Sequence, residues 1–235
     1  MKDPKIYLER DFLLHADMLN ALLDEKTETL YSEEDGVMLK FGGHGPYAIT
    51  AANAEAMTKM AKLIEKEHFA AVVRPFKFLP EFFAVKGRCG TMPCYQASYR
   101  SKEPVPEPEV PGIEIRPLSE EHIPFVMKEY EDDEEYITFC VKNGMLGAFD
   151  ENGNCAGFIG THGEGSMGLL KVLPEYRRRG IGIALEARML NKKLREGKIP
   201  HDHVVVGNEK SMALQRKIGM GIADNMVTWV FNDWE

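Results

Sequence analysis

The sequence has little cysteine, no long apolar run and no excess of positive charge. Its four cysteines, Cys89, Cys94, Cys140 and Cys155, form no CxxC pair that would begin a tetrahedral zinc site. No stretch approaches the roughly 18 apolar residues of a membrane span, and the N-terminus is too charged for a signal peptide. The formal charge of −8 opposes general affinity for nucleic acid or anionic membranes. We therefore expect a cytoplasmic protein with reduced cysteines, no metal, no nucleic-acid partner and no membrane association.

The composition is that of an ordinary globular protein, with 44% hydrophobic and 28% charged residues in 235. This length suits one large or two modest domains. Residues 101–112 read SKEPVPEPEVPG, and their prolines remove backbone donors and favour an extended chain. We interpret this segment as an interdomain linker. The predicted ranges are therefore 1–100 for an N-terminal domain, 101–112 for the linker and 113–235 for a C-terminal domain.

The N-terminal half has the patterns of a mixed α/β domain. Apolar spacing and turn residues predict a helix over 11–24, a hairpin around Asp35-Gly36, a helix from a Thr50 cap to about 66, a strand over 69–73, a helix over 79–85 and a strand over 94–99.

The C-terminal half alternates strands and helices in the order β, α, α, β, β, β, α, β, α, β. The predicted elements are a strand over 113–116, helices over 119–130 and 134–141, a hairpin of 146–149 and 155–159, a strand over 166–173, a helix over 183–197, a strand over 203–206, a helix over 208–218 and a strand over 226–231. Residues 69–99 and 201–231 share the order strand, helix, glycine, strand. Chance and internal duplication explain this similarity equally well.

Residues 172–184 carry the strongest chemical signal, because a strand ends at a proline, turns through arginines and glycines, and runs into a helix. The first helical turn has N–H groups without intrahelical partners and the positive end of the macrodipole, so this pattern favours an anion site. The glycine spacing is neither GxGxxG nor GxxxxGK[ST], which excludes the dinucleotide fingerprint and the nucleotide P-loop.

The charge around this segment runs against the charge of the whole chain. Residues 171–198 hold nine basic and three acidic side chains, which favours a specific polyanionic ligand. Two other interpretations stay open. One is a glycine turn followed by a solvated basic helix face, and the other is a basic helix that docks on nucleic acid or an acidic protein.

The sequence resembles the GNAT superfamily of acyl-CoA-dependent N-acyltransferases over residues 113–235. The family pattern [RQ]xxGxG/A is present as Arg177-x-x-Gly180-x-Gly182. The second family pattern is matched by Asn208, Ser211, Leu214, Lys217, Gly219 and Met220. The resemblance implies a mixed α+β fold with a central, splayed mixed sheet. The N-terminal half is similar to a degenerate GNAT-like half, as in the glycine N-acyltransferase branch. It would then form one side of the acceptor site or a homodimer interface.

The resemblance also implies acetyl-CoA, or another short acyl-CoA, as co-substrate. Backbone amides from Arg178 through Ala184 would hold its pyrophosphate, the arginines would neutralise its phosphates, and the strand edge at 171–173 would pair with the pantetheine arm. The implied coenzyme-binding residues are Lys171, Val172, Leu173, Arg177, Arg178, Arg179, Gly180, Ile181, Gly182, Ile183, Ala184, Asn208 and Ser211.

The implied reaction is direct acyl transfer to a primary amine of a small molecule or peptide. An ammonium must first lose a proton, so the site needs a base. Glu164 and His162 are the candidates, because their spacing of two puts them on one face if strand pairing extends that far. A polar hairpin tip is the alternative. Gln215 stands where the family often has a tyrosine acid, which motivates the rival hypothesis of a non-catalytic acyl-CoA-binding or regulatory module.

Overall fold

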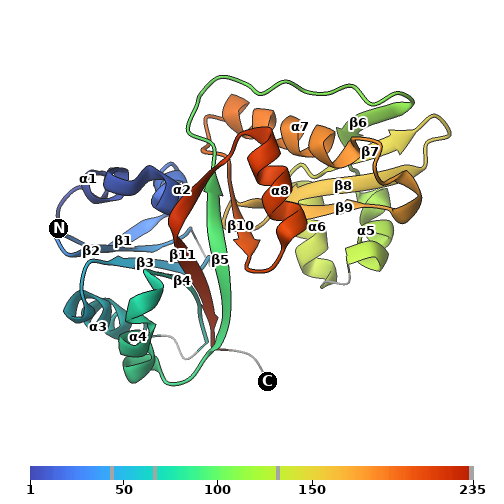
Figure 1. The fold of residues 1–235 in the computed structure, drawn as a ribbon. Helices are drawn as coiled ribbons and strands as arrows, with labels where there is room; N and C mark the ends of the chain where they lie inside the picture. Colours follow the sequence, from blue (N-terminus) through green and yellow to red (C-terminus); the bar gives the residue numbers. More distant parts are fainter. Residues whose placement is uncertain (43–44, 66–67, 131–132, 233–235) are drawn as a thin grey trace. The chain divides into compact units, whose positions relative to one another are not determined.

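The structure is a computed structural model that describes residues 1–42, 45–65, 68–130 and 133–232. The chain forms two compact units, one of Met1–Arg100 with His203–Glu235 and one of Ser101–Asp202 (Figure 1). These units differ from the predicted domain ranges, because the C-terminal strand pairs with strands of the N-terminal half.

A seven-stranded mixed sheet forms the centre of the first unit. In spatial order its strands are β1 (Glu28–Glu33), β2 (Gly36–Lys40), β3 (Tyr47–Ala51), β4 (Ala70–Arg74), β11 (Gly221–Phe231), β5 (Gly90–Ser98) and β10 (His201–Val205). Strands β3 and β4 are parallel, whereas β11 runs antiparallel to both β4 and β5. The last strand of the chain therefore lies between two strands of the N-terminal half.

Helices cover both faces of this sheet. Helices α1 (Pro4–Leu8) and α2 (Phe12–Ala21) lie on one face, and α3 (Ala54–Lys62) and α4 (Leu79–Lys86) on the other, as Figure 1 shows. Neighbouring residues of β4 point to opposite faces of the sheet, because Val72 packs with Leu14 of α2 and Val73 packs with Phe82 of α4. The unit also contains α8 (Glu209–Ile218).

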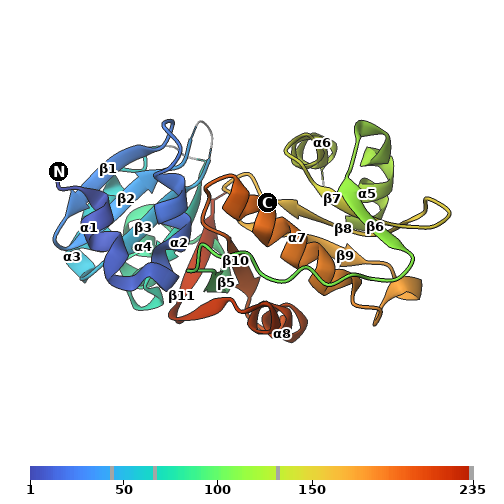
Figure 2. The ribbon, with the colours of Figure 1, turned by 90° about the horizontal axis from the view of Figure 1, so that it is seen from above.

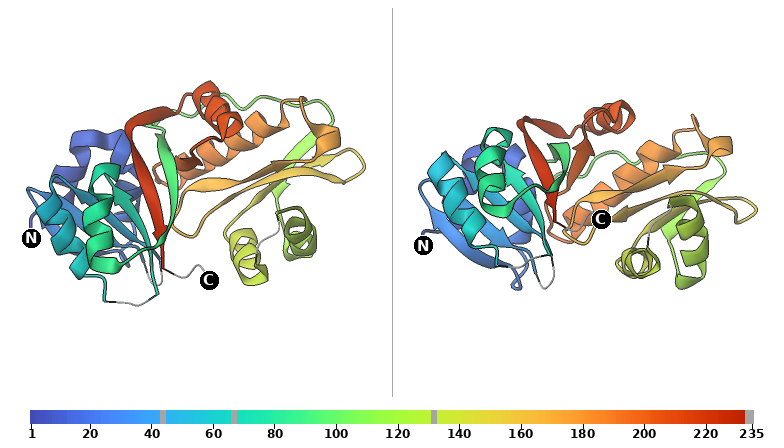
Figure 3. Two further views of the ribbon diagram at one scale, coloured as in Figure 1. Left: turned by 60° about the horizontal axis from the view of Figure 1, so that its bottom comes forward. Right: turned by 90° about the horizontal axis from the view of Figure 1, so that it is seen from below.

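The second unit is built on a four-stranded antiparallel sheet in the order β6 (Ile113–Pro117), β7 (Leu146–Asp150), β8 (Cys155–Thr161) and β9 (Met167–Val172). Helices α5 (Ile123–Tyr130) and α6 (Glu134–Lys142) lie on one face, and α7 (Ile181–Arg195) lies on the other (Figures 2 and 3). Phe158 and Leu169 of the sheet pack under α5 and α6 with Val126 and Ile137. Strand β9 is an edge strand of this sheet.

The mixed α+β class is confirmed, and most predicted elements are present with small boundary shifts. The helix predicted from a Thr50 cap is wrong at its start. Residues Tyr47–Ala51 form β3, which is buried along its whole length and so lacks polar alternation. Asn53 is the true N-cap of α3, and its side chain accepts a hydrogen bond from the Ala56 amide at 2.8 Å.

The predicted order of strand, helix, glycine and strand is present twice, as β4, α4, Gly87, β5 and as β10, α8, Gly219, β11. Both glycines end their helix at positive φ, 79° and 93°, a conformation that favours glycine.

The predicted linker lies within the second unit as an extended segment along α7. The Val105 side chain is buried, and its backbone N–H donates to Asn191 Oδ1 at 2.9 Å. We call residues 104–111 the proline strap.

Candidate functional site

The segment between β9 and α7 is a tight loop that contains the predicted anion site. A 3-10 turn, Pro174–Tyr176, follows β9, and Gly180 is the N-cap of α7. Arg178 and Gly180 both have positive φ, at 62° and 87°. Glycine adopts this region without strain, whereas an arginine there is strained and is held by its surroundings.

The first turn of α7 has main-chain N–H groups without an intrahelical acceptor. No side chain of the described residues caps it, and the amides of Ile181, Gly182 and Ile183 lie in the first turn, where intrahelical acceptors are lacking. The Ala184 amide donates to the Gly180 carbonyl at 3.1 Å, so it is engaged within the helix. Of the predicted amides from Arg178 through Ala184, the three in the first helical turn therefore lie at the positive end of the macrodipole without an intrahelical acceptor.

The three arginines of the loop are exposed but differ in their contacts. Arg177 Nε donates to the Val172 carbonyl at 3.0 Å, which holds this side chain against the end of β9. A guanidinium nitrogen of Arg179 lies 3.4 Å from the Pro111 carbonyl oxygen, and the group sits 5.6 Å from the centre of the Tyr176 ring. Since a guanidinium has five N–H donors, both arginines retain donors for a phosphate.

The Tyr176 side chain fixes the loop to the second sheet. Its hydroxyl donates to Asp150 Oδ2 at 2.7 Å, at the end of β7. This hydrogen bond, with others from Asn154 and Asn152, lowers the pKa of Asp150 to about 2. The carboxylate therefore stays ionised, and stays an acceptor for Tyr176, across the physiological range.

Strand β9 offers a free edge beside the loop, and its ladder is irregular. Phe158 pairs with Lys171 and Gly160 with Gly168, so β9 holds one extra residue between these pairs. Leu169, in this β-bulge, is buried and has a φ of 50°. Lys171 is held by Glu129, whose carboxylate lies 3.3 Å from its ammonium. The predicted pantetheine-binding residues 171–173 thus lie at a sheet edge directly before the anion loop.

The two predicted bases lie in a turn and not on paired strands. Strand β8 ends at Thr161, and the turn closes through the His162 amide to the Ser166 carbonyl at 2.8 Å. The pairing that would place His162 and Glu164 on one face therefore does not extend to them. The Glu164 carboxylate accepts a hydrogen bond from the Ser166 hydroxyl.

His162 belongs to a small aromatic cluster that the sequence did not reveal. Its Nδ1 is hydrogen-bonded to the Tyr136 hydroxyl of α6, and the two rings are stacked with their centres 6.2 Å apart. A Cβ at Gly168 would come within 2.3 Å of His162 Nε2, so this glycine lets the imidazole pack directly on β9. The sequence signal for this contact is the lone glycine in an apolar strand.

Lys193, near the end of α7, is a second residue that sequence patterns missed. Burial lowers the pKa of its ammonium to about 8, although the charges of Glu196 and Glu164 act in the opposite direction. A basic residue counted on a solvated helix face is thus substantially desolvated.

The second sequence pattern lies in the first unit, whereas the loop and the hairpin turn lie in the second. Asn208 is the N-cap of α8, and its Oδ1 accepts from the Ser211 amide at 3.1 Å. Asn208 and Ser211 were both predicted to bind the coenzyme, and in the structure they form the N-terminal cap of α8 with each other. Gln215, in the position of the family tyrosine, is buried.

Within the ranges that the structure describes, no helix is long and apolar enough to cross a membrane. Among the same residues, no group of three or more His, Cys, Asp or Glu side chains is arranged to hold a metal ion. No disulfide joins any of the four cysteines in the described part of the chain, and Cys94 and Cys140 are buried.

Comparisons with known proteins show which proteins resemble this fold and the C-terminal part of the sequence. Residues 145–230 match the model of the FR47-like protein family. A Drosophila protein is similar in structure, with a TM-score of 0.68 and 20% identity over 83% of this chain and 73% of its own. No protein of curated function matches the sequence.

Two bacterial structures share the fold over nearly the whole chain. A GCN5-related N-acetyltransferase from Kribbella flavida has a TM-score of 0.55 and 13% identity, covering 95% of this chain and 97% of its own. An acetyltransferase of the GNAT family from Colwellia psychrerythraea has a TM-score of 0.53 and 13% identity, with 97% and 94% covered. The chain thus shares its fold with these acetyltransferases, and its C-terminal part matches the FR47-like family model.

Proposed function

We propose that this chain is an N-acetyltransferase that moves an acetyl or short acyl group from acyl-CoA to a primary amine by direct attack in a ternary complex. The observation that carries the proposal is the uncapped N-terminus of α7 behind the Arg177-x-x-Gly180-x-Gly182 loop. The FR47-like match over residues 145–230 and the shared fold support the same class of activity.

The residues present suit an acyl-CoA. The amides of Ile181, Gly182 and Ile183 would donate hydrogen bonds to the pyrophosphate, and the exposed Arg178 side chain would add a charged donor. The free edge of β9 would pair with the amide groups of the pantetheine arm. When bound, the coenzyme supplies a thioester, which is the activated acyl donor.

Two features of β9 and its turn bear on acyl transfer. The bulge at Leu169 removes one residue from the ladder, so a main-chain N–H there is our candidate for polarising the thioester carbonyl. For the base that takes a proton from the ammonium, Glu164 and His162 remain the candidates. Glu164 is hydrogen-bonded to Ser166, whereas His162 is held by Tyr136.

The leaving thiolate needs no strong acid, since a thiol pKa of about 8.5 makes the anion a tolerable leaving group. Gln215 has no proton to deliver in this role. Its burial motivates the rival, an acyl-CoA-binding module without turnover.

Calorimetry with coenzyme A tests binding, and thiol release from acetyl-CoA with a panel of primary amines tests turnover. Binding with thiol release on at least one amine supports the enzyme. Binding without release on every amine supports the rival module, and absence of binding contradicts both.

The base is tested by Glu164→Gln, which we expect to lower kcat about a hundredfold while leaving coenzyme affinity within about twofold. Ser166→Ala is the matched control, since it removes the hydrogen bond to Glu164 but keeps the carboxylate. Wild-type turnover in Glu164→Gln would exclude Glu164 and direct attention to His162→Gln.

A further inference from the structure

The proline strap is anchored to α7 by a buried amide. Asn191, only 4% exposed, accepts from the Val105 N–H through Oδ1 at 2.9 Å and donates to the Val105 carbonyl through Nδ2 at 2.9 Å. A side-chain amide thus pairs with both polar groups of one residue, as a neighbouring strand would. Since both partners are buried, loss of either bond leaves an unsatisfied polar group.

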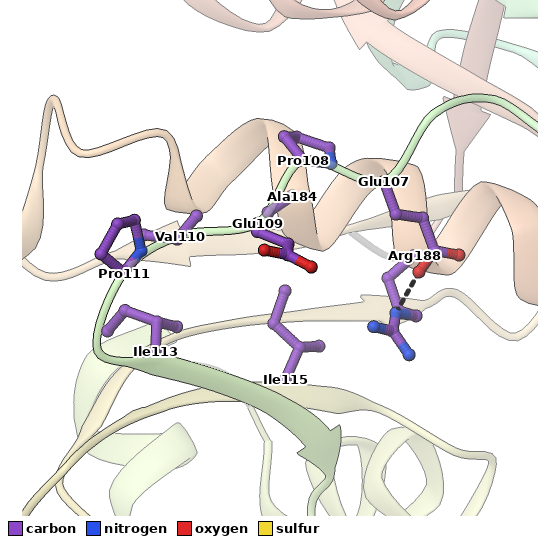
Figure 4. A pocket seen from close by; sticks show the side chains of 9 residues that line it. All are labelled: Glu107, Pro108, Glu109, Val110, Pro111, Ile113, Ile115, Ala184 and Arg188. Atoms are coloured by element: carbon purple, nitrogen blue, oxygen red, sulfur yellow. Dashed lines mark ion pairs between the residues drawn. The ribbon is translucent and has the colours of Figure 1, made fainter.

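Glu107 forms a second anchor two residues further along the strap. Its Oε1 accepts from Asn191 Nδ2 at 2.8 Å, and its Oε2 lies 2.6 Å from Arg188 Nε (Figure 4). Asn191 and Arg188 lie on successive turns of α7. One carboxylate therefore ties the strap to the same side of the helix that holds Val105.

The far end of the strap lies against the candidate coenzyme loop. Val110 Cγ2 lies 3.9 Å from the position that a Cβ on Gly180 would take, and the Pro111 carbonyl oxygen is the atom near Arg179. The Ile113 amide donates to the Val110 carbonyl at 3.0 Å, which joins this end to β6. The strap therefore connects the C-terminal half of α7 to the N-cap of the same helix.

The middle of the strap is not tightly packed. A cavity of about 280 Å³ lies between the strap, β6 and α7, with Ile113, Ile115 and Ala184 among its lining residues (Figure 4). Because this space is open, the position of Val110 depends on the anchors at each end. The prolines at 104, 106, 108 and 111 keep the segment extended and restrict the conformations of its backbone.

We propose that Asn191 is a positioning residue for the coenzyme loop, and that it acts through the strap by holding Val110 against Gly180 and the Pro111 carbonyl against Arg179. This inference rests on the proposed function, because it assumes that the loop binds acyl-CoA. It assigns to a segment outside both family patterns a role in coenzyme affinity.

The test uses the full chain with coenzyme A as the probe. In Asn191→Asp the acceptor for the Val105 N–H is kept, but the donors to Val105 and Glu107 are lost and two carboxylates face each other. We expect the Kd for coenzyme A to rise at least fivefold, and the amides of residues 105–110 to exchange hydrogen faster. In an enzyme assay the KM for acyl-CoA rises, whereas kcat at saturation stays within twofold.

The double variant Asn191→Asp, Glu107→Gln is the rescue. The glutamine amide can donate to the new carboxylate, so we expect at least half of the lost binding free energy to return. Val110→Gly is the second, independent variant. It leaves both anchors in place and removes the side chain that lies beside Gly180, and we expect a two- to threefold rise in Kd.

Faster exchange in the strap with an unchanged Kd would overturn the inference, as would an unchanged Kd in Val110→Gly. If the wild-type chain itself fails to bind coenzyme A, the proposed function fails, and the role of the strap fails with it. The two failures are thus distinguished by the wild-type measurement alone.

Discussion

The two units each contain a strand that leads directly into a helix, and the two connections differ at every feature that matters for binding an anion. In the first unit, β3 is paired on both sides and passes to α3 through two residues, where the Asn53 side chain caps the helix. In the second, β9 is an edge strand, the connection has three arginines, and Gly180 leaves the start of α7 uncapped.

This difference separates a structural connection from one that is suited to a ligand. A capped helix has already satisfied the donors that an anion would need, and a strand paired on both sides has no edge to offer. The same strand-to-helix arrangement thus supports stability in the first unit and is available for coenzyme binding in the second.

The largest expected effect concerns the stability of the first unit, in which β3 leads into the capped helix α3. His15 Nε2 is hydrogen-bonded to Thr50 Oγ1 at the end of β3, and burial, with the nearby Arg74 charge, lowers the pKa of His15 to about 4. Between pH 6.5 and 4 the unfolded chain therefore binds a proton that the folded chain does not. Stability should fall by up to about 3 kcal/mol as the pH drops through this window.

Urea unfolding at pH 7 and pH 4.5 measures this loss, with His15→Gln as the comparison. The variant should lose less stability on acidification than the wild type, because its side chain does not titrate. Equal losses in the two proteins would show that His15 does not control the acid sensitivity of the first unit.

The next largest expected effect concerns the loop between β9 and α7 in the second unit. Gly180→Val places a β-branched residue at φ 87°, a conformation that costs roughly 1–2 kcal/mol even for ordinary residues. We expect the Kd for coenzyme A to rise at least about thirtyfold as the loop rearranges, which is about 2 kcal/mol. Gly197→Val is the matched control, since it places the same residue at φ 69° beyond the other end of α7, where an added Cβ would meet no atom within 4 Å. If Gly180→Val binds coenzyme A like the wild type, the loop is not the site.

Charge reversal tests the arginines of the same loop. The double variant Arg177→Glu, Arg179→Glu should raise the Kd at least about tenfold, a loss of about 1.4 kcal/mol. The effect should shrink with added salt, because exposed charges are screened. Lys62→Glu, Lys77→Glu makes the same change in net charge at exposed sites of the first unit and should leave the Kd unchanged. Equal losses in both double variants would indicate a nonspecific effect of net charge.

The smallest effect concerns the cap of the first unit. Asn53→Ala removes the side chain that caps α3 and should cost about 1 kcal/mol of stability, measured by urea unfolding. Coenzyme affinity should not change, since the proposed binding site does not include this connection. Altered affinity would contradict the division of roles between the two connections.

Local patterns predicted the local features of this protein well. The loop between β9 and α7, the hairpin of β7 and β8 and the Gly219 helix end all follow from residues within a few positions of each other. The predicted coenzyme-binding residues 171–173 and 177–184 lie close together along the chain, on either side of the turn Pro174–Tyr176, and for that reason a sequence pattern could group them.

Features that depend on distant pairing could not be predicted in this way. Nothing local in β11 specifies that Val230 pairs with Ala71 on one side and Thr91 on the other. The Thr50 cap was a wrong prediction because β3 is buried on both faces, and its short apolar run resembles the start of a helix. The contact of Asn191 with Val105 spans 86 residues and has no sequence signature.

The most direct test compares the backbone amides of the two helix N-termini in one experiment. Two-dimensional amide NMR spectra of the labelled chain, recorded with and without coenzyme A, report on Ile181–Ile183 of α7 and on Ala54–Ala56 of α3 together. The account predicts large shifts for the first set and none for the second. Unmoved amides at the start of α7 in the presence of saturating coenzyme would contradict it.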